Sequence, residues 1–145
     1  MIQLASVRVR SKRVVVESRS VTDQGFATGN GWYVSGDEGT LTDHQLGAWV
    51  REALDRSEWH IPAPALNRSE PYLAEFGVKT TNEFAKGCLS TSVDREAGVI
   101  TASAMRYVGR GGFESTNSMF RATCPADADD ATIGDIVRQA IAHSS

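Results

Sequence analysis

Hydrophobic and polar residues alternate along the first third of the chain, a pattern typical of β-strands. Two valine-rich runs, at 7–9 and 14–16, are separated by the polar residues Ser11 to Arg13, which predicts a hairpin. A glycine-rich turn then precedes an aromatic run, Trp32 to Val34, and this run predicts a further strand.

The first helix is predicted after Thr42, where the hydrophobic spacing changes to that of a helix. Thr42 and Gln45 form a capping box. The apolar face is made by Leu46, Trp49, Val50, Ala53 and Leu54. A second capping box, Thr80 with Glu83, predicts a short helix that Gly87 should close in the left-handed conformation.

The segment after this short helix again alternates. Residues 89–93 and 99–108 predict a second hairpin, ended by glycines at 109–112. By contrast, the stretch Ser57 to Tyr72 predicts an irregular connection over the surface, because proline cannot donate a backbone hydrogen bond. Three of the four prolines lie in it: Pro62, Pro64 and Pro71.

Part of the pattern repeats when the sequence is shifted by 87 positions. The second copy of Asn30 to Tyr33 is Asn117 to Phe120. In the helices the matched pairs are Asp43 and Asp130, Gly47 and Gly134, Val50 and Val137, Arg51 and Arg138, and Ala53 and Ala140. Two copies are too few for a solenoid, so we expect the two strand, loop and helix units to pack together. A glycine in the first helical turn costs about 1 kcal/mol relative to alanine, which indicates that each helix closely approaches a neighbouring backbone.

Composition then bounds the class of protein. The chain has 145 residues, 41% hydrophobic and 23% charged, values that are ordinary for one globular domain. We therefore predict a single α+β domain over residues 1–145, with a largely antiparallel sheet and about three helices. The net charge of -3 gives no electrostatic case for nucleic-acid binding.

Cellular location is suggested by two further features. Cys88 and Cys124 are too few for a disulfide framework, and we expect both to be reduced and buried. Residues 1–20 contain no apolar run of signal-peptide or membrane-span length. We expect a cytoplasmic protein with no membrane partner.

Candidate chemistry is sparse along the chain. The three histidines, His44, His60 and His143, are isolated from one another and from cysteine. Cys88 has no base that the sequence identifies, and the glycines at 109–112 do not precede a helix as a phosphate loop would. We therefore predict no metal, no cofactor and no enzymatic activity.

Two groups of residues suggest binding instead. Acidic residues gather at Asp37 and Glu38 and again at 127–130, where they either cap helices or form a surface for a basic partner. Large aromatic residues lie in or beside the proline-rich connection, where they either fold onto the core or anchor an interface. These aromatic residues are Trp59, Tyr72 and Phe76.

The order of several dispersed motifs resembles the immunity proteins of bacterial contact-dependent growth inhibition systems. The motifs are Gly31-Trp32-Tyr33, Leu46-Gly47, the segment Val78 to Gly87, Cys88-Leu89-Ser90 with Val93, Gly112-Phe113 and Ile133-Gly134. The resemblance implies a cytoplasmic antidote that binds the C-terminal toxin domain of a large surface-delivered effector. It also implies that the toxin is a nuclease and that the immunity protein has no chemistry of its own.

The resemblance transfers no toxin-binding motif, so contact residues are inferred from the acidic loops and the aromatic connection. The predicted toxin-binding residues are Asp37, Glu38, Trp59, His60, Glu70, Tyr72, Glu75, Asp127 and Asp129. Two alternatives stay open. One is a small metal-dependent or nucleic-acid-modifying enzyme that uses Asp43 and His44. The other is a homo-oligomer that pairs its basic N-terminal strands across an edge.

Overall fold

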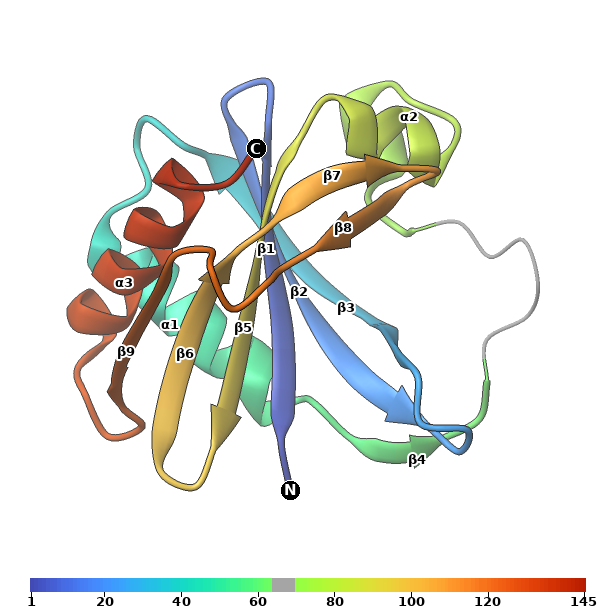
Figure 1. The fold of residues 1–145 in the computed structure, drawn as a ribbon. Helices are drawn as coiled ribbons and strands as arrows, with labels where there is room; N and C mark the ends of the chain where they lie inside the picture. Colours follow the sequence, from blue (N-terminus) through green and yellow to red (C-terminus); the bar gives the residue numbers. More distant parts are fainter. Residues whose placement is uncertain (64–69) are drawn as a thin grey trace.

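The computed structural model describes residues 1–63 and 70–145 and has an α+β fold, as predicted (Figure 1). Six strands form an antiparallel sheet in the order β3-β2-β1-β5-β6-β9, and β4 pairs parallel to β2 beside them. A separate two-stranded sheet is formed by β7 and β8. The strands are β1 (Gln3–Arg10), β2 (Arg13–Thr22), β3 (Ala27–Asp37), β4 (Trp59–Ile61), β5 (Leu89–Glu96), β6 (Val99–Ala104), β7 (Arg106–Gly109), β8 (Gly112–Glu114) and β9 (Arg121–Pro125).

Both predicted hairpins are present. β1 and β2 are joined by Ser11 and Lys12, which have φ values of 51° and 61°. Two adjacent left-handed residues match the right-handed twist of the flanking strands. Here they set the register in which Val9 lies opposite Val14 and Val7 opposite Val16, so these four valines face the same side of the sheet.

That valine-lined side carries the main core. The helices α1 (Asp43–Asp55) and α3 (Asp130–Ala142) lie side by side on it (Figure 1). Their apolar faces cover valines, alanines and Ile100 of the sheet in one buried cluster. The predicted capping box at Thr42 and Gln45 begins α1, because each side chain bonds the other residue's backbone N–H.

The opposite side of the sheet is lined by charged residues, because arginines and a glutamate alternate with the valines of β1 and β2. One end of this side is covered by the 3-10 helix η1 (Leu73–Phe76), by α2 (Thr81–Lys86) and by the β7–β8 hairpin. A second, smaller core lies beneath them. Its fully buried members are Val15, Tyr72, Leu73, Phe84 and Cys88.

The internal repeat is larger than the sequence analysis predicted. Shifting α1 by 87 positions reproduces the bounds of α3, and the N-cap residues Thr42 and Asp129 also correspond. β1 and β5 pair at the centre of the sheet, while β3 and β9 form its two edges. Each unit is therefore a hairpin, an edge strand and a helix, and the two units are related by an approximate twofold axis.

The predicted close approach of the two glycine-bearing helices is confirmed. A Cβ atom added at Gly47 would overlap the carbonyl oxygen of Asp130, and one added at Gly134 would overlap the carbonyl oxygen of Asp43. The backbones of α1 and α3 therefore touch at two equivalent points. Only glycine leaves room for this approach.

Three local predictions were wrong. Residues 99–108 form two strands, because the backbone of Met105 bonds Ser144 and Ser145 of the C-terminus where the chain leaves the main sheet. Gly87 ends α2 with φ of -104°, and its missing Cβ instead leaves room for the guanidinium of Arg10. Met119 and Phe120, the counterparts of Trp32 and Tyr33, precede β9, so the duplicated strand begins later than expected.

The proline-rich connection contains a strand that the sequence analysis did not predict. Trp59 to Ile61 form β4, and the chain is again described from Glu70 onward. Residues 64–69, which include Pro64, lie outside the described residues.

Candidate partner-binding surface

Asp37, Glu38 and Glu75, three of the predicted contact residues, meet near the β1–β2 turn. The backbone N–H of Glu38 donates to the carbonyl of Lys12 at 2.9 Å. Glu75 accepts a 2.8 Å hydrogen bond from Ser35, which lies on β3 two residues before Asp37. This corner also contains Lys12 and Arg13, so it carries both signs of charge.

Asp127 and Asp129 lie in the loop before α3, where Arg51 of α1 donates to the backbone carbonyls on either side of Asp127. Asp129 is the N-cap of α3, and its carboxylate accepts a 2.8 Å hydrogen bond from the backbone of Thr132. Hydrogen bonding from the side chain and the backbone of Thr132 lowers the pKa of Asp129 below its usual range. Asp129 therefore caps α3, which is one of the two roles that the sequence left open for this acidic loop. The side chain of Asp127 is exposed and caps no helix.

Trp59 and His60 lie on β4. The indole Nε1 of Trp59 donates a 2.5 Å hydrogen bond to the carbonyl of Ile2, which holds β4 against the N-terminus. The ring of His60 packs edge-on against that of Trp59, with 6.1 Å between ring centroids, and His60 is exposed. A partner can therefore reach both residues of this strand.

The prediction that Tyr72 contacts a partner is not supported, because the side chain is fully buried. Its hydroxyl accepts a 2.9 Å hydrogen bond from Arg8 on β1. The adjacent Glu17 is also buried, at 2% exposure, and pairs with Arg19 at 3.1 Å. Burial raises the pKa of Glu17 to about 7, and the neighbouring Glu70 adds to the rise. Tyr72 belongs to an internal ionic cluster, and Glu70 lies at the edge of that cluster.

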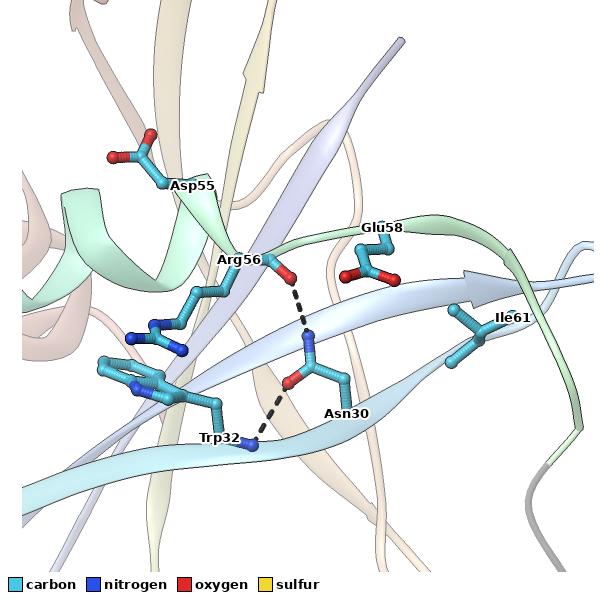
Figure 2. A pocket seen from close by; sticks show the side chains of 6 residues that line it. All are labelled: Asn30, Trp32, Asp55, Arg56, Glu58 and Ile61. Carbon is cyan, nitrogen blue, oxygen red and sulfur yellow. Dashed lines mark hydrogen bonds between the residues drawn. The ribbon is translucent and has the colours of Figure 1, made fainter.

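A hollow of about 550 Å³ opens next to β4, between β3 and the C-terminal end of α1. Figure 2 shows its side chains, with the Arg56 guanidinium beside the Trp32 ring. The distance from the guanidinium carbon to the ring centroid is 5.2 Å, which is within the range of a cation–π contact. The residues that line the hollow are Asn30, Trp32, Asp55, Arg56, Glu58 and Ile61.

The wall of this hollow is held rigidly by Asn30. Its amide donates to the carbonyl of Arg56 at 3.1 Å, and its side-chain oxygen accepts from the backbone N–H of Trp32 at 3.1 Å (Figure 2). The same amide donates to Ser18 and Ser20 of β2. Tryptophan and arginine are enriched among residues that dominate binding energy, and a fixed pair of them loses little entropy on binding.

The sequence analysis missed the contribution of Trp32, Arg56 and Phe26 to this surface. Phe26 is 70% exposed in the β2–β3 turn, beside Thr22 and Asp23, whose backbones lie against Ile61. A large aromatic residue directly after Asp23-Gln24-Gly25 is a signal that the sequence did contain. Arg56 carried no such signal, because only the fold brings it over Trp32.

The features that remain concern residues 1–63 and 70–145, the part of the chain that the structure describes. No group of three histidine, cysteine or acidic side chains there is arranged to hold a metal ion. None of the helices in that part of the chain is long and apolar enough to cross a membrane. Cys88 and Cys124 are free and buried, as predicted, and burial raises the pKa of Cys88 to about 11.

Comparison with known proteins identifies the family. The family model described as CDI immunity protein matches residues 3–144. A search of curated protein sequences found no match. One similar solved structure is a protein of unknown function, NMB0488, from Neisseria meningitidis, with a TM-score of 0.81 at 15% identity, covering 100% of this chain and 96% of that one.

A second similar structure is a CdiA-CT/CdiI toxin and immunity complex from Yersinia pseudotuberculosis. The TM-score is 0.79 at 18% identity, covering 100% of this chain and 98% of that one. At these identities both structures support the fold. The family match spans nearly the whole sequence, and the chain therefore belongs to the CDI immunity protein family.

Proposed function

We propose that this protein binds the C-terminal toxin domain of a contact-dependent growth inhibition effector and neutralises it in the cytoplasm. The observation that carries the proposal is the family match over residues 3–144. The structural neighbour from Yersinia pseudotuberculosis, described as a toxin and immunity complex, supports it. Inhibition is stoichiometric, because the protein acts by covering the toxin and turns over no substrate.

The toxin is proposed to be a nuclease, which binds nucleic acid through a basic surface. An acidic or mixed surface on the immunity protein complements such a toxin and speeds association. The hollow beside β4 meets this requirement, because Asp55 and Glu58 flank the Trp32 and Arg56 pair. We therefore place the centre of the toxin contact at this hollow, extended by Trp59, His60 and Phe26.

The corner formed by Asp37, Glu38 and Glu75 and the exposed Asp127 are proposed as alternative contacts. Asp127 and Asp37 lie in different loops, and a standard interface of about 800 Å² per partner concentrates its binding energy in a few residues. The alternatives therefore make different predictions for charge-reversal variants.

The experiment uses the effector whose gene lies next to the gene of this protein. We expect its C-terminal domain to be toxic alone, to be tolerated when this protein is co-expressed, and to co-purify with it. Nucleic acid recovered from intoxicated cells should be cleaved, and cleavage should stop at one equivalent of this protein. A toxin domain that remains active with excess immunity protein would overturn the proposal.

The surface is mapped by affinity measurements on matched variants. Glu58→Arg and Arg56→Ala should each weaken toxin binding by about tenfold or more, since both side chains are exposed and neither supports the core. Asp127→Arg is a matched reversal outside the hollow, in the loop before α3, and should leave affinity unchanged. A loss confined to Asp127→Arg would move the interface to the α3 end.

A further inference from the structure

Four serines form a row of small polar side chains on the charged side of the sheet. Ser6 of β1 lies opposite Ser92 of β5, and Ser92 in turn lies opposite Ser103 of β6. Ser90, two residues before Ser92 on β5, lies opposite Arg8 of β1. Because serine is short, this part of the sheet is not filled by its own side chains, and the hairpin β7–β8 lies beside it.

A cavity of about 350 Å³ occupies the space that the serines leave. Ser6, Ser90 and Ser92 line it from the sheet, and Gly111, Gly112 and Phe113 line it from the hairpin. Two arginines, Arg8 and Arg19, complete the lining together with Ala27 and Met105. None of the lining residues within the described chain is acidic.

Several donors around this cavity have no strong acceptor. Ser6 is only 5% exposed, and its hydroxyl has no hydrogen-bond partner among the described residues. The Nε of Arg8 is buried and also has none there. The hydroxyl of Ser90 contacts only the Met105 sulfur, at 4.0 Å, which is a weak acceptor. Buried polar groups are nearly always paired, so these donors leave room for a further acceptor beside the unpaired Oε2 of Glu17, which lies opposite Ser6 on β2.

The positive charge around the cavity is incompletely balanced. Arg8 donates to the Tyr72 hydroxyl, which is neutral at physiological pH as an ordinary tyrosine is, and burial raises its pKa further. Arg19 pairs with Glu17, whose pKa near 7 leaves it only partly ionised at neutral pH. The two guanidinium groups therefore lie beside Glu17, which is only partly ionised at neutral pH, and beside Glu70 at the edge of the cluster. A ligand that brings both acceptors and negative charge would satisfy this site.

We propose that the cavity is a binding site for one small oxyanion, a carboxylate or phosphate group, held by Arg8, Arg19 and the hydroxyls of Ser6, Ser90 and Ser92. Guanidinium and hydroxyl groups are the usual ligands of such anions. The group comes either from an acidic side chain of the toxin or from a free anion. The first source rests on the proposed function, and the second does not.

The free-anion source is tested with the full chain and inorganic phosphate. Phosphate at millimolar concentration should shift the backbone amide signals of Ser92, Gly111 and Gly112 in NMR spectra, and should do so saturably. Arg19→Gln should weaken this binding by about tenfold or more, because a charge-assisted hydrogen bond is lost. Shifts scattered over the surface and insensitive to Arg19→Gln would show an adventitious ion only and would count against the proposal.

Ser6→Ala provides a variant whose fold is secure. Removing a buried hydroxyl that has no partner should leave the free energy of unfolding unchanged or increase it, yet weaken phosphate binding by about fivefold. Ser103→Ala is the matched control on the same row, because Ser103 is 8% exposed and does not line the cavity. It should leave phosphate binding unchanged.

The toxin source is tested by repeating the affinity measurements with the toxin domain. If the toxin supplies the anion, Ser6→Ala and Arg19→Gln weaken toxin binding, and phosphate competes with the toxin. If the two variants weaken phosphate binding but not toxin binding, the site takes a free anion. If the variants bind phosphate and the toxin as tightly as the wild type does, the proposal is wrong, even where wild-type protein neutralises the toxin normally. Failure of neutralisation itself would leave the phosphate result standing.

Discussion

Arg51 on α1 reaches across the helix pair to Asp130, the first residue of α3, with 2.9 Å between Nε and Oδ1. The approximate twofold axis repeats the contact, since Arg138 on α3 donates to Asp43, the first residue of α1, at 2.5 Å. Each arginine also donates to backbone carbonyls that precede the partner helix. The two helix N-termini are therefore fastened reciprocally, on either side of the glycine contacts.

The glycine contacts lead to the first prediction. Gly47→Ala and Gly134→Ala should each lower the free energy of unfolding by about 2–4 kcal/mol, although alanine is the better helix former. The added methyl would meet a backbone carbonyl, which cannot move without separating α1 from α3. Urea denaturation measures the change. His44→Ala, at an exposed position in the same turn, is the control and should change stability by less than about 0.5 kcal/mol.

The reciprocal arginines lead to the second prediction. Arg51→Ala should cost about 2 kcal/mol, because Asp130 and the carbonyls of Ala126 and Ala128 lose a shared donor. Arg51→Lys should recover only part of this, since an ammonium cannot present the same planar set of donors.

The surface pair of Arg56 and Glu52 is the matched control, and Glu52→Ala should cost less than about 0.5 kcal/mol. Equal losses for Glu52→Ala and Arg51→Ala would mean that the helix-crossing contact has no special role. Calorimetric unfolding of the two variants measures both losses of stability.

The third prediction concerns pH and Glu17. Its pKa is about 7 in the folded protein against an ordinary value of 4.5, so the folded state holds the proton over that range while the unfolded state loses it. Stability should therefore fall as pH rises from about 4.5 to 7 and then level off, by about 3 kcal/mol in total.

Glu17→Gln should flatten this part of the pH profile, because the amide does not titrate. The measurement is denaturant unfolding of both proteins across the range, compared as a difference so that other groups cancel. A difference that stays constant between pH 4.5 and 7 would show that Glu17 does not titrate in this range.

The fourth prediction concerns the buried tyrosine. Tyr72→Phe removes the acceptor of the Arg8 hydrogen bond and should lower the free energy of unfolding by about 1–2 kcal/mol. Because Tyr72 is fully buried, toxin affinity at a temperature where the variant is folded should not change. Isothermal calorimetry with the toxin domain tests this, and a clear loss of affinity would restore Tyr72 to the contact set.

Local patterns in the sequence were sufficient for the elements of the fold. The valines at 7–9 and 14–16 predicted the first hairpin, and Thr42 predicted the start of α1, because alternation and capping depend on neighbours a few positions away. The repeat at a shift of 87 positions also predicted the close approach at Gly47 and Gly134. The α+β class followed from these features together.

Only the tertiary structure decided which functional groups share a surface. Arg56 meets Trp32 because α1 ends over β3, and Tyr72 is buried because η1 and α2 fold onto the charged side of the sheet. Arg51 meets Asp130 across 79 positions of sequence because α1 packs against α3. Such contacts depend on strand register and helix crossing, and these are set by packing of the whole chain, which no short segment of sequence specifies.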